Sequence, residues 1–583
     1  MALVSRQGGF LHIENWSLIL RNPSHSIKII SSRWRIWHTS GAAAPESNLA
    51  PSHLDTTHEA HLRSSDSTLK SESASTSGDP EKGREDVIDK ELEQDGYDIE
   101  AGAPQPELEK TAEKEKDPNL VEWDGPDDPE NPQNMPRWRK WLITMSLSFM
   151  TTWITFASSV FSTATIVTAK EFGVSTEVMI LATSLVVFGF AVGPLFWSPL
   201  SELYGRRIPL FSGYAIFAIF QIPVAVAQNV ETILVCRFLI GIFGCSPLAV
   251  VGGAMADFWD PVDRAVAISA FASATFIGPV LGPIVGGYLT DSYLGWRWTA
   301  WITLIASGSF GLLAFLIVPE TYAPRILQKR AARLRRETGN EALHSLLDNA
   351  RPTMNDIVTK YLLRPVMMLF LEPILLLITL YLALVYGILY LFFEAYPVSF
   401  ESVRGWTNEG IAGLPFIGIL VGVLCGAALI IWQTKTRFAR KLAKHGRVVP
   451  EERLIPMMIA SVLLPAGLFW FGWTSHPSTS WGAQVVAGVP IGMGILVIFM
   501  QGLNYIIDVY LMFANSAIAA NTLVRSSLGG AFPLFATQMY NKLGVDWASS
   551  LLGFITVAMI PIPVLFFFYG KKLRAMSRFS PKL

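Results

Sequence analysis

From Trp141 to about residue 569, long apolar runs alternate with short polar breaks. A helix needs roughly 20 consecutive apolar residues to cross the hydrocarbon core of a bilayer. The chain therefore predicts an all-α membrane protein with 12 transmembrane helices. These helices are expected at 141–163, 178–198, 208–227, 232–254, 266–289, 297–318, 373–395, 411–432, 454–474, 482–503, 513–536 and 546–569.

The composition agrees with a membrane protein. Hydrophobic residues make up 51% of the chain and charged residues 16%, whereas about a quarter of the residues in a soluble protein are charged. The formal net charge of −1 predicts no nucleic-acid partner. The three cysteines all fall inside apolar runs, and no CxxC spacing occurs. We therefore expect no disulfide framework, no metal site and no cofactor.

A polar stretch divides the predicted helices into six and six. It spans 319–372 and separates an N-terminal six-helix half, 137–318, from a C-terminal half, 373–570, which a short tail at 571–583 follows. Two six-helix halves joined by one long loop are the layout of secondary transporters that are built from internal repeats. The sequence thus predicts a transporter that works by alternating access, with the lipid bilayer as its surroundings.

The first part of the chain has a different composition. Residues 79–130 contain 20 acids and only 6 bases, with few large apolar side chains. Such a segment cannot bury enough apolar surface to offset its ordering entropy, so residues 1–136 are expected to form a disordered cytoplasmic tail. Residues 1–45 carry five bases against one acid, a pattern that weakly resembles a transit peptide. A tail extension or a gene-model artefact is the alternative.

The distribution of Lys and Arg predicts the orientation. The loops on one side carry 24 Lys and Arg, and the loops on the other side carry four. The side with many bases, which includes both termini and the linker, is expected to be cytoplasmic. The expected location is the plasma membrane, with the vacuolar membrane as the alternative. We expect a monomer.

The source of energy follows from motifs that are missing. The sequence has no GxxxxGK[ST] motif, and no soluble segment is large enough for a nucleotide-binding domain. An ATP-driven pump is therefore excluded, and transport is either passive or driven by an ion gradient. No arrangement of nucleophile and base indicates an enzyme. The first predicted helix contains no Asp, Glu or His, so it cannot hold a carboxylate that carries a proton.

The fifth predicted helix contains the stretch GPVLGPIVGG. Gly278, Gly282 and Gly286 recur every four residues and share one helix face, so another helix backbone can approach closely there. Pro279 and Pro283 each remove a helix hydrogen bond and bend the helix. A kinked helix that serves only for tight packing is the alternative to a role in transport.

A second motif, SPLSELYGRRIPL, lies between the second and third predicted helices. Gly205 permits a turn that other residues resist. Arg206 and Arg207 lie at the membrane interface, and the carboxylate of Glu202 could form a gate with the end of a neighbouring helix. The alternative is a basic loop that only sets the topology.

Two arginines fall within apolar runs, where a charge is costly and usually faces a partner or the interior of the bundle. Arg237 lies in the fourth helix, and the alternative for it is a side chain that extends to the outer interface. Arg525 lies near the centre of the eleventh helix, one turn after Asn521. By topology, Glu394 and Asp508 are its nearest candidate counter-charges.

Aromatic residues are frequent in the seventh predicted helix. Tyr386 and Tyr390 stand four residues apart, so they share a face of that helix. They could line a site for an apolar substrate, and the alternative is packing against lipid.

Several of these stretches resemble a known family. Gly278, Gly282, Pro283, Gly286 and Gly287 match the GxxxGPxxGG motif of drug:proton antiporters in the major facilitator superfamily, position by position. This resemblance implies export, with the bent helix helping to seal one side of the membrane.

The stretch SPLSELYGRRIPL resembles the loop signature GxLaDrxGRR of the same superfamily. Ser198 stands where the first Gly is usual, Glu202 replaces Asp, and Leu203 replaces Arg. The missing Arg makes the usual charge network of that loop doubtful. The position of Arg237 resembles an arginine of the fourth helix that the superfamily uses in proton transfer.

Between residues 121 and 583 the chain resembles fungal 12-spanner drug:proton antiporters, which include polyamine, azole and mycotoxin exporters. The stretches that carry this resemblance are EWDGPDDPENPQNMPRWRKW, VPET, YLFFEAYP and NYIIDVYLMFANSAIAANTLVRSSLGGAFPLFATQMYNKLG. It implies the major facilitator fold and proton-coupled export of a small organic molecule. A nutrient importer of the same fold and a membrane nutrient sensor that does not transport are the alternatives. None of the motifs identifies the substrate.

Overall fold

The computed structural model describes residues 117–349, 358–445 and 448–580, and most of them are helical. The predicted tail up to residue 116, including the question about residues 1–45, lies outside the described residues. The N-terminal half begins after a short 3₁₀ turn, η1 (Pro132–Asn134). Its helices are α3 (Arg137–Ser159), η2 (Val160–Ala164), α4 (Thr165–Phe172), α5 (Thr176–Val192), α6 (Pro194–Tyr204), α7 (Arg207–Ile219), α8 (Gln221–Ala225), α9 (Val230–Phe258), α10 (Pro261–Asp291) and α11 (Arg297–Ile317).

The linker contains helices of its own, namely α12 (Ala323–Thr338), α13 (Leu346–Asn349), η3 (Val358–Leu363) and α15 (Arg364–Leu371). The C-terminal half follows. Its helices are α16 (Pro373–Pro397), η4 (Val398–Val403), α17 (Glu409–Gly413), η5 (Leu414–Phe416), α18 (Ile417–Gln433), η6 (Thr434–Phe438), α19 (Ala439–His445), η7 (Pro450–Arg453), α20 (Leu454–Trp473), α21 (Trp481–Tyr510), η8 (Leu511–Phe513), α22 (Ala514–Met559) and α23 (Pro561–Ala575).

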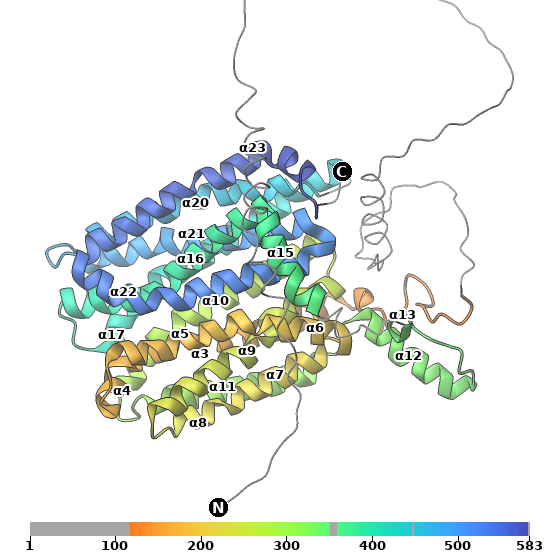
Figure 1. Cartoon of the computed structure of the whole chain (residues 1–583), viewed down its shortest axis with the longest axis horizontal. Coiled ribbons are helices and arrows are strands. Elements are labelled where there is room, and N and C mark those ends of the chain that lie inside the picture. Colours follow the sequence, from red (N-terminus) through yellow and green to blue (C-terminus); the bar gives the residue numbers. More distant parts are fainter. Residues whose placement is uncertain (1–116, 350–357, 446–447, 581–583) are drawn as a thin grey trace, which may run out of the picture. The chain divides into compact units, whose positions relative to one another are not determined.

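The twelve predicted crossings are present in the described residues. Nine helical segments are long and apolar enough to span a membrane, and α5 with α6, bent by 41°, makes a tenth. The segment Trp481–Ala575 is 95 residues long. One straight helix of that many residues would be several times longer than a bilayer is thick. The segment reverses at η8 and again at Gly544, where φ is +78°, so it supplies three crossings (Figure 1).

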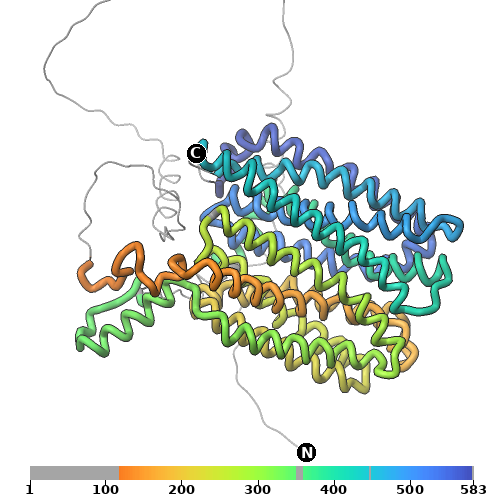
Figure 2. The backbone as a smooth tube through the Cα atoms, turned by 180° about the vertical axis from the view of Figure 1, so that it is seen from behind, coloured from red at the N-terminus to blue at the C-terminus, as the bar shows by residue number. Residues whose placement is uncertain are grey.

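Each half has its own apolar core. One cluster of buried side chains is confined to residues 143–318, and the larger one lies mainly in residues 368–566. Four residues of the N-terminal half belong to this second cluster, namely Val187, Ala272, Phe276 and Val280. They come from α5 and α10, so these two helices form part of the contact between the halves. Figure 2 shows the two groups of helices side by side.

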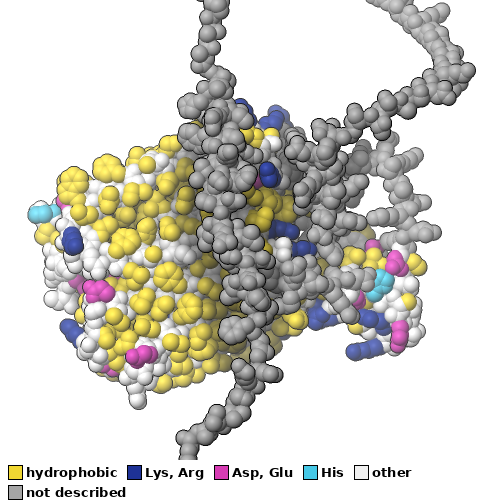
Figure 3. Space-filling model, viewed as in Figure 1, with side chains coloured by type: hydrophobic (Ala, Val, Ile, Leu, Met, Phe, Trp, Pro, Cys, Tyr) yellow, Lys and Arg dark blue, Asp and Glu magenta, His cyan; other side chains and the backbone are white. Residues whose placement is uncertain are grey.

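The outer surface of the helical bundle is apolar, as a membrane requires. Leu312, Leu316 and Phe568 are examples of large hydrophobic side chains that are more than half exposed. Hydrophobic side chains cover the flank of the bundle in Figure 3, and the charged side chains in that view gather toward its two ends. We call the end that holds α12 and α15 the linker end, and the end that holds α4 and α17 the far end (Figure 1).

The structure differs from the sequence prediction on both sides of the N-terminal half. Residues 117–136 have a defined conformation where disorder was predicted, because arginines of the linker neutralise their acids. Arg330 forms ion pairs with Asp124 and Asp128, and Arg333 pairs with Glu130 at 2.7 Å. The linker, which was predicted to be a loop, is largely helical in its described part, and its helix α12 carries the arginines that pair with this segment.

Candidate functional site

Arg237 lies inside the N-terminal half. The alternative of a side chain that extends to the outer membrane interface is therefore wrong. The Arg237 side chain is buried, and it donates hydrogen bonds to the carbonyl oxygens of Ala182 at 3.0 Å, Ala157 at 2.9 Å and Ser158 at 3.4 Å. Because α3 ends at Ser159, the last carbonyls of that helix lack partners within it. A cation is favourable at a helix C-terminus, so Arg237 stabilises the point where α3 passes into η2.

A hydrogen bond next to Arg237 joins the two halves. The hydroxyl oxygens of Ser158 and Tyr390 lie 2.9 Å apart, and both side chains are buried. Ser158 donates its own proton to the carbonyl oxygen of Thr155 at 2.6 Å, so Tyr390 is the donor in the pair. Tyr386 in turn donates to Tyr390 at 3.5 Å. Tyr390 therefore faces the other half. Both tyrosines are buried, so the alternative of packing against lipid is wrong for both.

Arg525 lies at the other end of this chain of polar groups. The centre of its guanidinium lies 5.2 Å from the ring centroid of Tyr386 and 4.7 Å from that of Phe499. Its Nε is buried and has no hydrogen-bond partner in the described part of the chain. Asn521, one turn earlier, donates to Thr379 Oγ1 at 3.3 Å.

Neither counter-charge predicted for Arg525 pairs with it. Asp508 forms an ion pair with Arg453 at 2.9 Å. Glu394 accepts a hydrogen bond at 3.3 Å from Thr537, which stands 12 residues after Arg525 on α22. That separation is roughly 18 Å along the helix axis, so Glu394 belongs to a different level of the bundle.

The glycine face of α10 has the close contact that its spacing predicts. A Cβ atom at Gly282 would collide with Ser159, and one at Gly286 would lie 2.6 Å from the carbonyl oxygen of Val160. A Cβ at Gly278 would likewise collide with α3. This face therefore packs directly on the backbone of the first transmembrane helix, where α3 passes into η2.

The last residue of the same motif faces the other half of the molecule. A Cβ at Gly287 would lie 2.5 Å from the carbonyl oxygen of Glu409, and a Cβ at Gly413 would lie 2.7 Å from that of Pro283. At the far end, α10 and α17 therefore meet backbone to backbone. One bent helix contacts the first crossing on one side and the C-terminal half on the other.

At the linker end, a network of charges surrounds the basic loop. Arg206 pairs with Asp257 at 3.0 Å and stacks over the ring of Tyr322 at 4.6 Å. The carboxylate of Glu320 accepts the backbone N–H groups of Arg206 at 2.8 Å and Arg207 at 3.2 Å. The ends of α9 and α11 thus fix the turn that follows α6.

Gly205 and Glu202 have separate roles in this turn. Gly205 has φ +86°, and a Cβ there would lie 2.5 Å from Glu320 Oε2. The predicted need for glycine is therefore confirmed. Glu202 accepts a hydrogen bond at 2.8 Å from Asn515 Nδ2, at the beginning of α22. The carboxylate that replaces the usual Asp thus contacts the opposite half.

Sequence reasoning missed three residues of this network. Asp257 lies in ADFWDP at the end of the fourth crossing, and Tyr322 follows the sixth. Glu320 belongs to the stretch VPET, which the sequence indicated only as part of the resemblance to fungal drug:proton antiporters. A carboxylate at the linker-end terminus of each of two crossings, near a GRR turn, is the signal that could have revealed the ion pair of Asp257 and the hydrogen bonds to Glu320.

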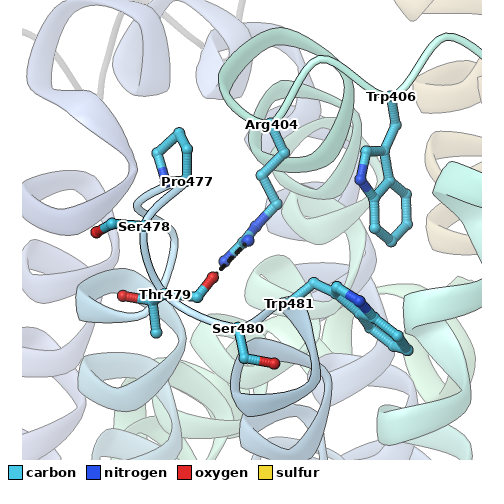
Figure 4. Close-up of a pocket in the computed structure, with 7 residues that line it drawn as sticks. All are labelled: Arg404, Trp406, Pro477, Ser478, Thr479, Ser480 and Trp481. Atoms are coloured by element: carbon cyan, nitrogen blue, oxygen red, sulfur yellow. Dashed lines mark hydrogen bonds between the residues drawn. The ribbon is translucent and has the colours of Figure 1, made fainter.

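A cavity of about 330 Å³ opens at the far end. It is lined by Arg404, Trp406 and the loop 477–481 (Figure 4). Arg404 donates hydrogen bonds to the carbonyl oxygens of Thr479 at 2.9 Å and Thr474 at 2.6 Å. These bonds hold the loop, so Arg404 has a structural role here.

Comparisons with known proteins agree with this architecture. The family profile described as Major Facilitator Superfamily matches residues 142–533. A citrinin biosynthesis cluster MFS transporter of Monascus ruber is 63% identical over 487 residues, which are 84% of this chain and 97% of that protein. An ascochitine biosynthesis cluster MFS transporter of Didymella fabae is 61% identical over 467 residues, which are 80% of this chain and 90% of that protein.

A solved structure shows the same fold. The chain is similar to a major facilitator superfamily proton:xylose symporter bound to 6-bromo-6-deoxy-D-glucose, with a TM-score of 0.52 and 17% sequence identity. The match covers 75% of this chain and 96% of that one. At this identity the likeness concerns the fold alone, whereas the two fungal relatives are similar over nearly their whole length. The chain belongs to the major facilitator superfamily, and it is a multi-pass membrane transporter and not an enzyme.

Proposed function

We propose that this transporter exports a small organic product of fungal secondary metabolism across the plasma membrane, in exchange for protons. The names of the two fungal relatives support the class of substrate, because both proteins are transporters of biosynthesis clusters. The resemblance of the glycine and proline stretch on α10 to the antiporter motif supports the direction of transport.

One observation carries the mechanism: among the contacts between the two halves, three of different chemistry lie at different levels of the bundle. Glu202 and Asn515 form a polar contact at the linker end. Ser158 and Tyr390 form one hydrogen bond inside the bundle. At the far end, Gly287 meets Glu409 through the backbone. Access from either end requires the contact at that end to separate, so these contacts are suited to act as alternating gates.

The residues of the two motifs then have distinct roles. Glu202 would close the linker end, while Gly205, Arg206 and Arg207 hold the turn that positions it. Gly278, Gly282 and Gly286 would let α10 move as one body with the first crossing, since substitution there would push the two backbones apart. Pro283 and Gly287 would form the far-end seal.

Glu394 is the proposed site of the coupled proton. It stands nine residues before the end of the crossing Pro373–Val403, and Thr537 donates to one of its carboxylate oxygens. The other oxygen, Oε1, is buried and has no hydrogen-bond partner in the described residues. A protonated carboxyl needs no counter-ion in such surroundings, so this group can change between a neutral and a charged form. Arg237 would support proton movement indirectly, because it fixes the carbonyl of Ser158.

Transport by purified protein in liposomes tests this proposal. Vesicles would be loaded with citrinin as the first probe, because a relative belongs to a citrinin cluster, and a pH gradient would be imposed. Export should require the gradient and stop when a protonophore is added. Glu394→Gln should lose this dependence, whereas Glu231→Gln should keep it, because Glu231 is exposed at the start of α9.

The alternatives predict other results. A nutrient importer would accumulate sugars or amino acids and ignore citrinin. A sensor would move no probe under any gradient. Fluorescence of a tagged chain in fungal cells would distinguish the plasma membrane from the vacuolar membrane.

A further inference from the structure

We infer that Arg525 binds the carboxylate of an aromatic substrate, at the contact between the two halves. This inference rests on the proposed function and names the substrate class of the same site. It starts from a cation that lies inside the bundle without a counter-ion among the described residues.

Four other arginines of the bundle that have little exposure show which kinds of partner Arg525 lacks. Arg206 pairs with Asp257, Arg453 with Asp508 and Arg574 with Glu451, at distances of 2.7–3.0 Å. Arg237 has three carbonyl oxygens instead.

Among the described residues, Arg525 has neither kind of partner. Its guanidinium lies against the faces of two aromatic rings, those of Tyr386 and Phe499. A cation–π contact gives roughly 0.5–2 kcal/mol, which is less than the several kcal/mol that burial of an ion costs. An unpaired charge is costly at this position. A substrate with a negative group would supply the counter-ion that Arg525 lacks.

The position of Arg525 fits a binding site and not a structural one. Gly529 follows it by one turn on α22, and a Cβ there would lie 2.7 Å from Tyr386 and 3.3 Å from Val187 of α5. This face of α22 is therefore directed toward the N-terminal half. Arg525 itself keeps part of its surface accessible, although Tyr386 is buried.

The chemistry of the side chains defines the ligand. A guanidinium presents a planar fork of donors that matches a carboxylate with two parallel hydrogen bonds. The surrounding side chains are aromatic and come from three helices. Phe499 packs against Phe276 at 5.2 Å and against Tyr386 at 6.1 Å between ring centroids. Aromatic rings prefer offset or edge-to-face packing with other rings, so an aromatic acid satisfies both features.

Equilibrium binding to the full chain in lipid nanodiscs tests the inference. Tritiated 1-naphthoate would be the probe, and 1-naphthamide would be the competitor, since it has the same ring and shape but no charge. We expect naphthoate to compete at least about tenfold more strongly than naphthamide, as a charge-assisted pair requires. Arg525→Gln should reduce that ratio to about twofold or less.

Two further variants keep the test decisive. Arg453→Gln removes another arginine of the same half, which is buried and lies away from the site, and should leave the ratio unchanged. If Arg525→Gln fails to fold, Arg525→Lys serves in its place. It keeps the charge but loses the fork, and should weaken naphthoate by about threefold to tenfold while naphthamide is unaffected.

Equal competition by the two probes, no binding of naphthoate, or an unchanged ratio in the Arg525 variants would each overturn the inference. Competition by chloride at the strength of naphthoate would overturn the aromatic part. These results are independent of export. A chain that exports neutral compounds and prefers no anion refutes this inference alone, and a chain that binds naphthoate but moves nothing refutes the proposed function alone.

Discussion

Asp128 accepts a hydrogen bond at 2.6 Å from Arg330, which lies 202 residues further along the chain. The same carboxylate accepts the backbone N–H groups of Asp124 at 2.9 Å and Glu130 at 2.8 Å. The segment before the first crossing is thus folded around one carboxylate, which the linker helix α12 holds. The outward position of this segment and of α12 at the linker end is visible in Figure 2.

Asp128→Asn should release this segment from α12. An amide offers one acceptor in place of a carboxylate, so both the ion pair and one of the two backbone hydrogen bonds weaken. Hydrogen exchange followed by mass spectrometry should show faster exchange in residues 117–136. Asp127→Asn is the matched control, because Asp127 is exposed. Equal exchange in the two variants would show that the ion pair does not hold the segment.

The same contact predicts a pH dependence. The hydrogen bond from Arg330, helped by two backbone N–H groups, lowers the pKa of Asp128 from 3.8 to about 2. A lowered pKa in the folded state means that the contact stabilises fully above the unfolded value and is lost as the pH falls toward about 2. Exchange in this segment, corrected for the intrinsic rate, should therefore be constant from about pH 8 to pH 5. Release near pH 6 would contradict this.

Ser158→Ala and Tyr390→Phe should slow transport to a similar extent, and the double variant should be no slower than either. Both single changes remove the same hydrogen bond between the halves, which is worth about 0.5–1.5 kcal/mol. A double-mutant cycle on transport rates measures this coupling. Tyr396→Phe is the control on the same helix, because the hydroxyl of Tyr396 has no hydrogen-bond partner in the described residues. Additive effects would show that the two hydroxyls act separately.

Glu320→Gln should destabilise the linker end. One carboxylate accepts the N–H groups of Arg206, Arg207, Thr321 and Tyr322. The amide would direct an NH₂ group at one of these donors, at a cost of about 1.5–3 kcal/mol per charge-assisted bond. Thermal unfolding in detergent should begin at a lower temperature. Glu341→Gln, at an exposed position after α12, should leave the transition unchanged.

The fold could be predicted from the sequence because its main constraint is local. Twenty apolar residues in a row satisfy a bilayer wherever they occur, so the crossings could be found without knowledge of their neighbours. The ends of the crossing helices were less predictable. The helix α9 extends to Phe258, beyond the predicted 254, because its backbone hydrogen bonds continue up to the N–H of Trp259, which donates to the carbonyl oxygen of Met255. The order of residues 117–136 depends on Arg330, which no local pattern connects to them.

The candidate site, too, could be predicted only in part. Arg237 and Arg525 could be identified because a charge in an apolar run is visible in one dimension. The groups that contact these two arginines could not be identified in this way. Arg237 is bound by carbonyl oxygens, which every residue has, and Ser158 finds Tyr390 across 232 positions of sequence. The two candidate counter-charges of Arg525 were chosen by topology, and the axial distance along α22 excludes Glu394.

Substitution of Gly282 by Ala should impair transport more than the same change at Gly308. Both glycines lie in transmembrane helices of the N-terminal half, so their intrinsic gain in helix propensity is the same. A Cβ at Gly308 would meet nothing within 4 Å, whereas a Cβ at Gly282 would lie 2.8 Å from the backbone nitrogen of Val160. A backbone atom cannot rotate away as a side chain can, so α10 and the first crossing must separate.

Overpacking of this kind costs about 1–3 kcal/mol, and Gly282→Val should cost more than Gly282→Ala. The penalty should affect the transport cycle before it affects folding, because α10 also forms the far-end contact between Gly287 and Glu409. A displaced α10 would change that seal. Transport rate per molecule at the cell surface, measured for the variants at positions 282 and 308, tests this. Normal transport by Gly282→Val at normal abundance would show that α10 and the first crossing need not stay in contact during the cycle.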